Sequence, residues 1–461
     1  MKTKPDKAAE APAIPLPVLQ KSTATLVSQD DLYDPFSQRP ETLQYSDFGA
    51  WAHMVKAGMG TGIMAMPMAF RYGGVVVGLL GTPLVGLICG HCVLLLVATA
   101  QHLYVRARVP AMTMDEVAYY AFLCGPHCLR RCAPAARMFV QGALFLTYFF
   151  VGISYTIFIG EAIQQLVEQW TGEAVLDRRV YIAVLAVVLV PLCQIRQMRT
   201  LVPFSVAANV CIVVGFAITM YYLLDRPPDM NRVDIGPTLL GLPIFFSTSI
   251  YSMEGIGTVM PVENTMRNPG HLGGWKGLAS RAVAFIVVLF TAIGLLGYMR
   301  FGLDVKGSIV LNLDPTAVPA QVVKALLALA IVCTFPLQFY ILLEQLTPVI
   351  NAKVTAPNLR NWAQVGTRVF LVAASLLVAV SFNSLELVIA LMGAVLFSTL
   401  GLLIPAGAHL IAELGQKADA KVSGTQRSSA WSTLTLVKDG FLVGLSLLTT
   451  CAGVYSALTP A

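Results

Sequence analysis

Long apolar stretches recur from residue 49 almost to the end of this chain, and each is long enough to cross a bilayer as a helix. An ordinary soluble domain has about 25% charged residues. This chain has 12% charged and 56% hydrophobic residues, with a mean hydropathy of +0.71. We therefore predict an all-α membrane protein. Eleven stretches can be read as transmembrane helices: 49–70, 75–101, 138–165, 180–195, 201–224, 238–262, 282–299, 321–343, 367–382, 386–411 and 436–457.

The chain is predicted to have two parts. Residues 1–46 are polar and rich in proline without a sustained apolar run, which predicts a disordered cytoplasmic tail instead of a signal peptide. Residues 47–461 form one membrane domain. With the N-terminus inside, the inner loops carry seventeen Lys and Arg residues and the outer side eight. The positive-inside rule therefore favours a cytoplasmic N-terminus.

Several function classes are not expected. The net charge of +6 is scattered through loops without forming one basic stripe, so nucleic acid is not an expected partner. No nucleophile elbow, phosphate loop or HExxH motif occurs, which argues against an enzyme. Cys124, Cys128 and Cys132 surround His127 and could suggest a metal site or palmitoylation, but the spacing also fits one face of a short helix. No metal and no cofactor is expected.

The first span is predicted to be interrupted. It reads HMVKAGMGTGIMAMPMAF from His53, with Gly58, Gly60 and Gly62 around Thr61. Each glycine weakens a helix by about 1 kcal/mol relative to alanine, and an unwound backbone survives in a membrane only where it lines a polar cavity. The amides that begin the second half-helix would then suit a carboxylate. Helix packing through GxxxG is the alternative reading.

The sequence of the sixth span favours interrupted helices over GxxxG packing. It reads LPIFFSTSIYSMEGIGTVMPVEN from Leu242, and it places hydroxyl groups, a carboxylate and two glycines at mid-depth: Ser247, Thr248, Ser249, Ser252, Glu254, Gly255 and Gly257. A carboxylate at that depth needs a buried partner, a water-filled cavity or a proton, and is a functional-site hypothesis by default. Breaks in spans one and six are what a five-plus-five inverted repeat predicts.

These two motifs resemble a known family. The strings HMVKAGMGTGIMAMP, from His53 to Pro67, and IYSMEGIGTVMPVENTMRNP, from Ile250 to Pro269, are similar to those of the proton-coupled amino acid transporters of the amino acid/auxin permease superfamily. The resemblance covers the chain from about residue 46 onward. It implies a LeuT-like fold of eleven transmembrane helices with broken helices 1 and 6. The implied activity is symport of small neutral amino acids (glycine, alanine or proline) with protons toward the cytosol by alternating access.

The resemblance also implies roles for individual residues. By position, His53 matches a histidine that couples protons, and an imidazole can change charge near neutral pH. Simple packing of His53 is the alternative. The predicted proton-coupling residues are His53 and Glu254, and the predicted substrate-binding residues are Gly58, Gly60, Thr61, Gly62, Thr248, Ser249, Tyr251 and Glu254. Protons would be the coupling ion.

The membrane of residence and two other functions stay open. The outer loops lack cysteine and the chain has no N-x-[ST] sequon, unlike typical members of that family, and the motifs YDPF at Tyr33 and YSDF at Tyr45 fit a loose endosomal sorting pattern. The plasma membrane and the lysosomal or endosomal membrane are both expected candidates. A proton-independent facilitator or exchanger, or an amino-acid sensor that signals through a partner of its N-terminal tail, are the alternatives to symport.

Overall fold

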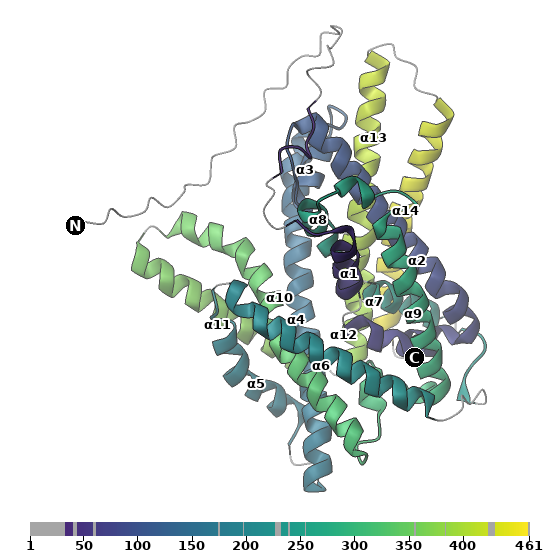
Figure 1. Cartoon of the computed structure of the whole chain (residues 1–461), viewed down its shortest axis with the longest axis vertical. Coiled ribbons are helices and arrows are strands. Elements are labelled where there is room, and N and C mark those ends of the chain that lie inside the picture. Colours follow the sequence, from purple (N-terminus) through teal and green to yellow (C-terminus); the bar gives the residue numbers. More distant parts are fainter. Residues whose placement is uncertain are drawn as a thin grey trace.

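Helices make up nearly all of the ordered chain in the computed structural model (Figure 1). The structure describes residues 33–39, 44–58, 61–173, 176–196, 198–225, 232–237, 240–253, 255–354, 356–382, 384–422 and 429–459. Across these ranges the only extended pairing is one parallel bridge between Tyr45 and Met266. The predicted all-α fold class is confirmed.

The helices follow one another with short connections. The α-helices are α1 (Asp47–Gly58), α2 (Met66–Ala107), α3 (Met114–Leu123), α4 (Ala133–Thr171), α5 (Arg178–Leu192), α6 (Met198–Leu224), α7 (Gly241–Ser252), α8 (Ile256–Thr265), α9 (Leu278–Phe301), α10 (Val318–Lys353), α11 (Pro357–Ser381), α12 (Leu385–Leu391), α13 (Ile404–Val422) and α14 (Ser429–Leu458). Short 3₁₀ helices are η2 (Thr61–Ala65), η3 (Arg130–Cys132), η5 (Pro269–His271), η6 (Gly302–Asp304) and η7 (Ile309–Asn312), and η8 (Met392–Phe397) and η9 (Thr399–Leu403) are π-helices.

Eight helices in the described part of the chain are long and apolar enough to cross a membrane. Helices α1, α5, α7 and α8 have 12, 15, 12 and 10 residues, fewer than the roughly 20 that one span needs. Three of these short helices belong to the first and sixth spans, which the sequence predicts to be broken. The number of eleven crossings therefore stays a prediction, although each predicted stretch contains helix.

Gly74 separates the first two predicted spans, although the helix label α2 runs through it. Its φ of 69° and ψ of 175° are open only to glycine, and a Cβ there would lie 2.6 Å from the Gly236 carbonyl oxygen. The amides of Val75 and Val76, released by the turn, donate to the Asp234 and Ile235 carbonyls at 3.0 and 3.1 Å. Residues 66–73 therefore complete the first span, and 75–107 form the second.

Packing divides most of the helices into two groups. Helices α1, α7, α8 and α9 pack around α2, whereas α4, α5, α6, α10 and α11 pack against one another. Small residues allow the closest approach within the first group. Gly86 and Gly90 of α2 face Val287 and Val283 of α9, and a Cβ at Gly90 would lie 2.9 Å from the Val283 side chain. The tenth span, from α12 to α13, contacts both groups.

Residues 33–39 pack on the membrane domain. Arg39 is buried and bonds Glu263 of α8, with Nη2 and Oε2 3.0 Å apart. Residues 1–32 and 40–43 lie outside the described residues, so the disordered tail predicted for residues 1–46 stays a prediction there. The Glu263 carboxylate, which is 0% exposed, thus has a buried cation as its partner.

Candidate functional site

The first span is interrupted where the glycines are concentrated. Helix α1 ends at Gly58, which is buried, and the chain becomes helical again at Thr61 as the 3₁₀ helix η2. Gly60 lies outside the described residues, and the side chain of Thr61 is not described. The break leaves the last carbonyl groups of α1 and the first amides of η2 without partners in their own helices.

The sixth span is interrupted in the same way. Helix α7 ends at Ser252 and α8 begins at Ile256. The Thr258 hydroxyl donates to the Gly255 carbonyl at 2.7 Å, which fixes the start of α8. Glu254 lies outside the described residues, so the structure does not place its carboxylate. The helix break predicted for this span is confirmed.

The two breaks lie against each other. A Cβ on Gly62 would be 2.7 Å from both the Cα and the carbonyl oxygen of Ser252, so only glycine fits there without moving the backbone. A Cβ on Gly255 would lie 3.8 Å from the Cα of Gly58. Two helix starts and two helix ends therefore meet in one small region. This arrangement can hold a zwitterion, because helix starts favour anions and helix ends favour cations.

Three buried hydroxyl groups on α7 have no hydrogen-bond partner within the described residues. Thr248, Ser249 and Ser252 are 0%, 0% and 1% exposed, and their oxygens are unpaired. Ser247, by contrast, donates to the Pro243 carbonyl at 2.8 Å. Thr248 and Ser249 lie four and three residues before Ser252, so both are neighbours of Ser252 on the surface of α7. Ser252 itself is the last residue of α7 before the break. Buried hydroxyls nearly always have partners, and these three are therefore available to a ligand.

Helix α4 brings an aromatic hydroxyl to the start of α8. A Cβ on Gly257 would lie 3.2 Å from the Tyr148 hydroxyl oxygen. Any side chain introduced at Gly257 would therefore crowd the Tyr148 hydroxyl. Helix α4, which belongs to the second group of helices, thus places a hydroxyl next to the helix break between α7 and α8.

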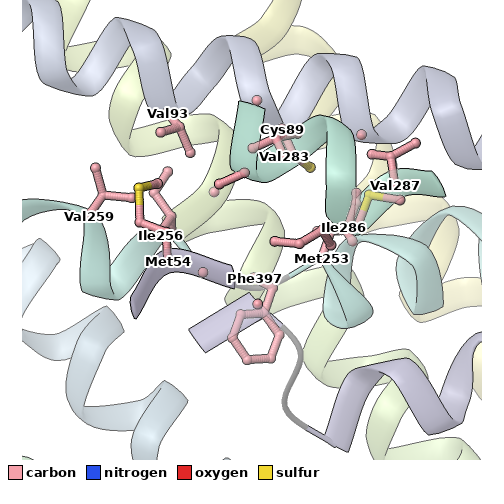
Figure 2. Close-up of a pocket in the computed structure, with 17 residues that line it drawn as sticks. Met54, Cys89, Val93, Met253, Ile256, Val259, Val283, Ile286, Val287 and Phe397 are labelled. Atoms are coloured by element: carbon pink, nitrogen blue, oxygen red, sulfur yellow. The ribbon is translucent and has the colours of Figure 1, made fainter. Parts of the chain in front are cut away.

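An apolar cavity of about 50 Å³ adjoins the breaks. Gly58 and Gly255 form one edge, and Figure 2 shows that the labelled side chains around it carry only carbon and sulfur atoms. These side chains come from α1, α2, α8, α9 and the segments beside them: Met54, Cys89, Val93, Met253, Ile256, Val259, Val283, Ile286, Val287 and Phe397. A cavity lined in this way suits an aliphatic group better than a charge.

Tyr251 and Phe397 join the sixth span to the tenth. Tyr251 is 6% exposed, and its ring packs edge-on against Phe397 with 5.4 Å between centroids. Phe397 ends the π-helix η8, and a second π-helix, η9, follows it. π-Helical turns are rare and often lie at functional sites. The sequence reading missed Phe397, because no side-chain pattern distinguishes a π-helix from an apolar α-helix.

His53 lies on the exposed face of α1, five residues before Gly58. Its imidazole packs edge-on against the Tyr45 ring, with 5.3 Å between centroids. The described structure therefore brings Gly58, Gly62, Thr248, Ser249 and Tyr251 together around the breaks, and it sets His53 at their periphery.

Comparisons with known proteins agree with this architecture. A family model described as "Transmembrane amino acid transporter protein" matches residues 44–452. The proton-coupled amino acid transporter-like protein pathetic of Drosophila melanogaster is 38% identical over 381 residues, which cover 82% of this chain and 80% of that protein. Vacuolar amino acid transporter 3 of Schizosaccharomyces pombe is 26% identical over 346 residues, 74% of this chain but only 50% of that protein.

One solved structure shows the same fold. The inward-facing conformation of Mhp1 superposes with a TM-score of 0.52 at 13% identity, covering 95% of this chain and 93% of that one. This likeness confirms the predicted LeuT-like class. The family model and the Drosophila relative show that the chain is a multi-pass membrane transporter, not an enzyme. It belongs to the amino acid/auxin permease family, among the proton-coupled amino acid transporter-like proteins.

Proposed function

We propose that this amino acid transporter is a symporter that carries small neutral amino acids together with protons toward the cytosol by alternating access. The observation that carries the proposal is the meeting of two helix breaks beside three unpartnered hydroxyl groups. An amino acid presents one carboxylate and one ammonium group, and the helix starts and ends at the breaks complement both charges.

The apolar cavity supports a neutral substrate. Among the described residues that line it, none carries a charged side chain. A charged substrate side chain would lose its hydration there without gaining a partner, at a cost of several kcal/mol. Side chains of the size of hydrogen, methyl or the proline ring would avoid that cost, so glycine, alanine and proline are the proposed substrates.

Protons are the proposed coupling ion, with His53 and Glu254 as the residues that bind them. The name of the Drosophila relative supports the coupling. One pH unit is worth about 1.4 kcal/mol and one charge moved through 100 mV about 2.3 kcal/mol. Together these would sustain roughly a 500-fold substrate gradient.

The proposed membrane of residence is the plasma membrane or a lysosomal or endosomal membrane, with the N-terminus in the cytoplasm. The vacuolar name of the yeast relative supports an internal membrane. No cofactor is proposed apart from the protons, and the N-terminal tail is the proposed contact for a signalling partner if one exists.

The test is uptake of labelled alanine and proline into proteoliposomes under an imposed inward pH gradient. Wild type and His53→Ala are compared with and without a proton uncoupler. His127→Ala is the matched control, because His127 is exposed in the loop between α3 and η3. Accumulation that disappears with the uncoupler and in His53→Ala, but persists in His127→Ala, is the expected result.

Other outcomes distinguish the alternatives. Saturable exchange that ignores both pH and the uncoupler would keep the site and replace symport by facilitated exchange. Binding of alanine without measurable flux would favour a sensor. In that case deletion of residues 1–32, which keeps Arg39 and Tyr45 in place, would remove the signalling partner, whereas the same deletion in a transporter would leave flux intact.

A further inference from the structure

A second group of ionisable side chains lies inside the membrane domain, away from the helix breaks. Its members are His91 of α2, His409 of α13, and Lys438 and Asp439 of α14. His409 and Asp439 fall within the predicted spans 386–411 and 436–457, near their cytoplasmic ends. In Figure 1, α13 and α14 lie side by side and reach the same end of the molecule as α3.

Asp439 and His409 form the centre of this group, which we name the His–Asp pair. The Asp439 side chain is 0% exposed, that of His409 is 16% exposed, and the Oδ2 and Nδ1 atoms are 2.6 Å apart. The Oδ1 atom forms an ion pair with Nζ of Lys438 at 3.3 Å but accepts no hydrogen bond from a described residue. One oxygen of this buried carboxylate therefore has a cation beside it and no hydrogen-bond donor within the described residues.

His91 supplies a second unsatisfied group. Its Nε2 atom is buried and has no hydrogen-bond partner within the described residues. The ring lies within electrostatic range of Lys438, Asp439 and His409. The thiol of Cys92 also lies within electrostatic range of Asp439 and Lys438, and Glu413 lies one turn beyond His409 on α13. Two half-buried imidazoles beside a buried carboxylate, with one ring nitrogen and one carboxylate oxygen unpaired among the described residues, are what a proton-binding site requires.

The His–Asp pair is connected to the substrate site through the tenth span. Helix α13 continues directly from the π-helices η8 and η9. Helix α14 bonds those π-helices, since Ser446 and Thr450 donate to the carbonyls of Ser398 and Ala394 at 3.0 and 2.8 Å. A Cβ on Gly393 of η8 would collide with the Ser247 carbonyl of α7. A shift of α13 against α14 would therefore reach the helix that carries the unpartnered hydroxyls.

We propose that the His–Asp pair, with His91 beside it, is a proton-binding site separate from His53 and Glu254, and that its occupancy sets the pH dependence of transport. With a neutral His409 imidazole, Asp439 and Lys438 balance each other. A bound proton makes the cluster cationic, and in a low-dielectric interior that extra charge changes how α13 and α14 pack. The proton-binding part stands independently of the proposed function, whereas the effect on transport rests on it.

The first experiment measures the protonation of the histidine side chains directly. The protein is labelled with ¹⁵N-histidine in liposomes, and nuclear magnetic resonance follows the imidazoles between about pH 5 and pH 8. His409→Gln and His91→Gln identify their own signals among the six histidines. His409 is expected to change charge within this range. Asp439→Asn should alter the pH dependence of the His409 signal, because it removes the carboxylate whose Oδ2 atom lies 2.6 Å from Nδ1.

The second arm measures the pH profile of alanine uptake in Asp439→Asn and His409→Gln. The matched control is His271→Gln, because His271 forms a pair with Asp47 at the same kind of distance, 2.8 Å, but 62% exposed. Both cluster variants should lose or displace the pH dependence, and the control should keep it.

Each outcome is decisive. A His409 signal that stays unchanged across the pH range would overturn the proton site and leave a fixed structural pair. A titrating His409 with an unaltered uptake profile in both variants would retain the proton site and overturn its role in transport. If the wild type shows no proton-driven uptake, the proposed function fails while the resonance arm still decides the site. Should Asp439→Asn not fold, His409→Gln provides the same uptake comparison.

Discussion

The unpartnered hydroxyl of Thr248 is the sharpest probe of the substrate site. Replacing Thr248 by valine keeps the shape and removes a buried oxygen that has no hydrogen-bond partner among the described residues. We expect the KM for alanine to rise about fivefold to tenfold, which corresponds to one lost hydrogen bond of about 1 kcal/mol. The thermal midpoint should stay the same or rise, because no bond within the protein is lost.

The control for this prediction is Thr99→Val. Thr99 is equally buried, but its hydroxyl donates to the Leu95 carbonyl of its own helix at 2.7 Å. Uptake by this variant should match the wild type. A Thr248→Val variant that loses stability while keeping its KM would show that the hydroxyl serves the fold instead of the substrate.

At the residue scale, the sequence was informative where a local pattern carries the function. Three glycines in five residues, and a run of hydroxyls in an apolar span, predicted the two breaks that the structure brings together. The partners of Arg39, and the pairing of His409 with Asp439 thirty residues away, could not be predicted. Such pairs depend on which faces of distant helices meet, and a single sequence does not fix the rotation of a helix about its axis.

Among the elements, residues 33–39 form an N-terminal clasp on α8, the second half of the sixth span. Arg39 donates to the Pro110 carbonyl and the Glu263 carbonyl, both at 2.8 Å, and its guanidinium lies over the Tyr104 ring. Tyr104 in turn donates to Glu263 at 2.8 Å. The clasp therefore joins α8 to the end of α2.

Removal of Arg39 should destabilise the protein. Arg39→Ala leaves Glu263 charged, 0% exposed and without its cation, and breaking a buried ion pair costs about 3–5 kcal/mol. A clear fall in the thermal midpoint of the purified protein is expected. The double variant Arg39→Met with Glu263→Met should recover much of the loss, since replacing both partners leaves no unpaired charge.

The matched control is Arg179→Ala. Arg179 also pairs with a carboxylate, Asp177, but at 3.9 Å and with side chains 61% and 67% exposed. Exposed pairs contribute about 0–1 kcal/mol, so its midpoint should barely change. Equal midpoints for Arg39→Ala and Arg179→Ala would contradict the clasp.

The extent of each helix was harder to predict than its existence. Apolar length located the helices, because the bilayer requires it. The turn at Gly74 and the π-helices of the tenth span carry no hydropathy signal, since both consist of apolar residues with local changes of backbone geometry. The turn at Gly74 could have been suspected only from the two adjacent glycines, Gly73 and Gly74. Such a pair also fits ordinary helix packing.

For the whole molecule, the orientation in the membrane is the next quantity to measure. Cys128 and Cys132 are exposed in and beside η3, on the side predicted to face the cytoplasm. In cells where the protein resides at the surface, a membrane-impermeant maleimide should label them only after permeabilisation. Asp304→Cys, placed in the exposed connection between α9 and α10, should be labelled in intact cells. Labelling of Cys128 and Cys132 in intact cells would reverse the predicted orientation.

At this scale the sequence predicted the all-α, LeuT-like class, because the apolar length of the helices follows from the membrane itself. The eleven crossings and the cytoplasmic N-terminus stay predictions. It predicted less about the assembly of the site. Tyr148 and Phe397 come from the third and tenth spans, and they reach the breaks only after the two helix groups have packed together.

The bridge between Tyr45 and Met266 bears on how tightly transport is gated. The Tyr45 amide donates to the Thr265 carbonyl at 2.8 Å and the Arg267 amide to the Tyr45 carbonyl at 3.1 Å. The start of α1 and the end of α8 are thereby fastened together, so neither half-helix can swing outward alone. A pathway bounded by these two half-helices can then open on this side only when both move together.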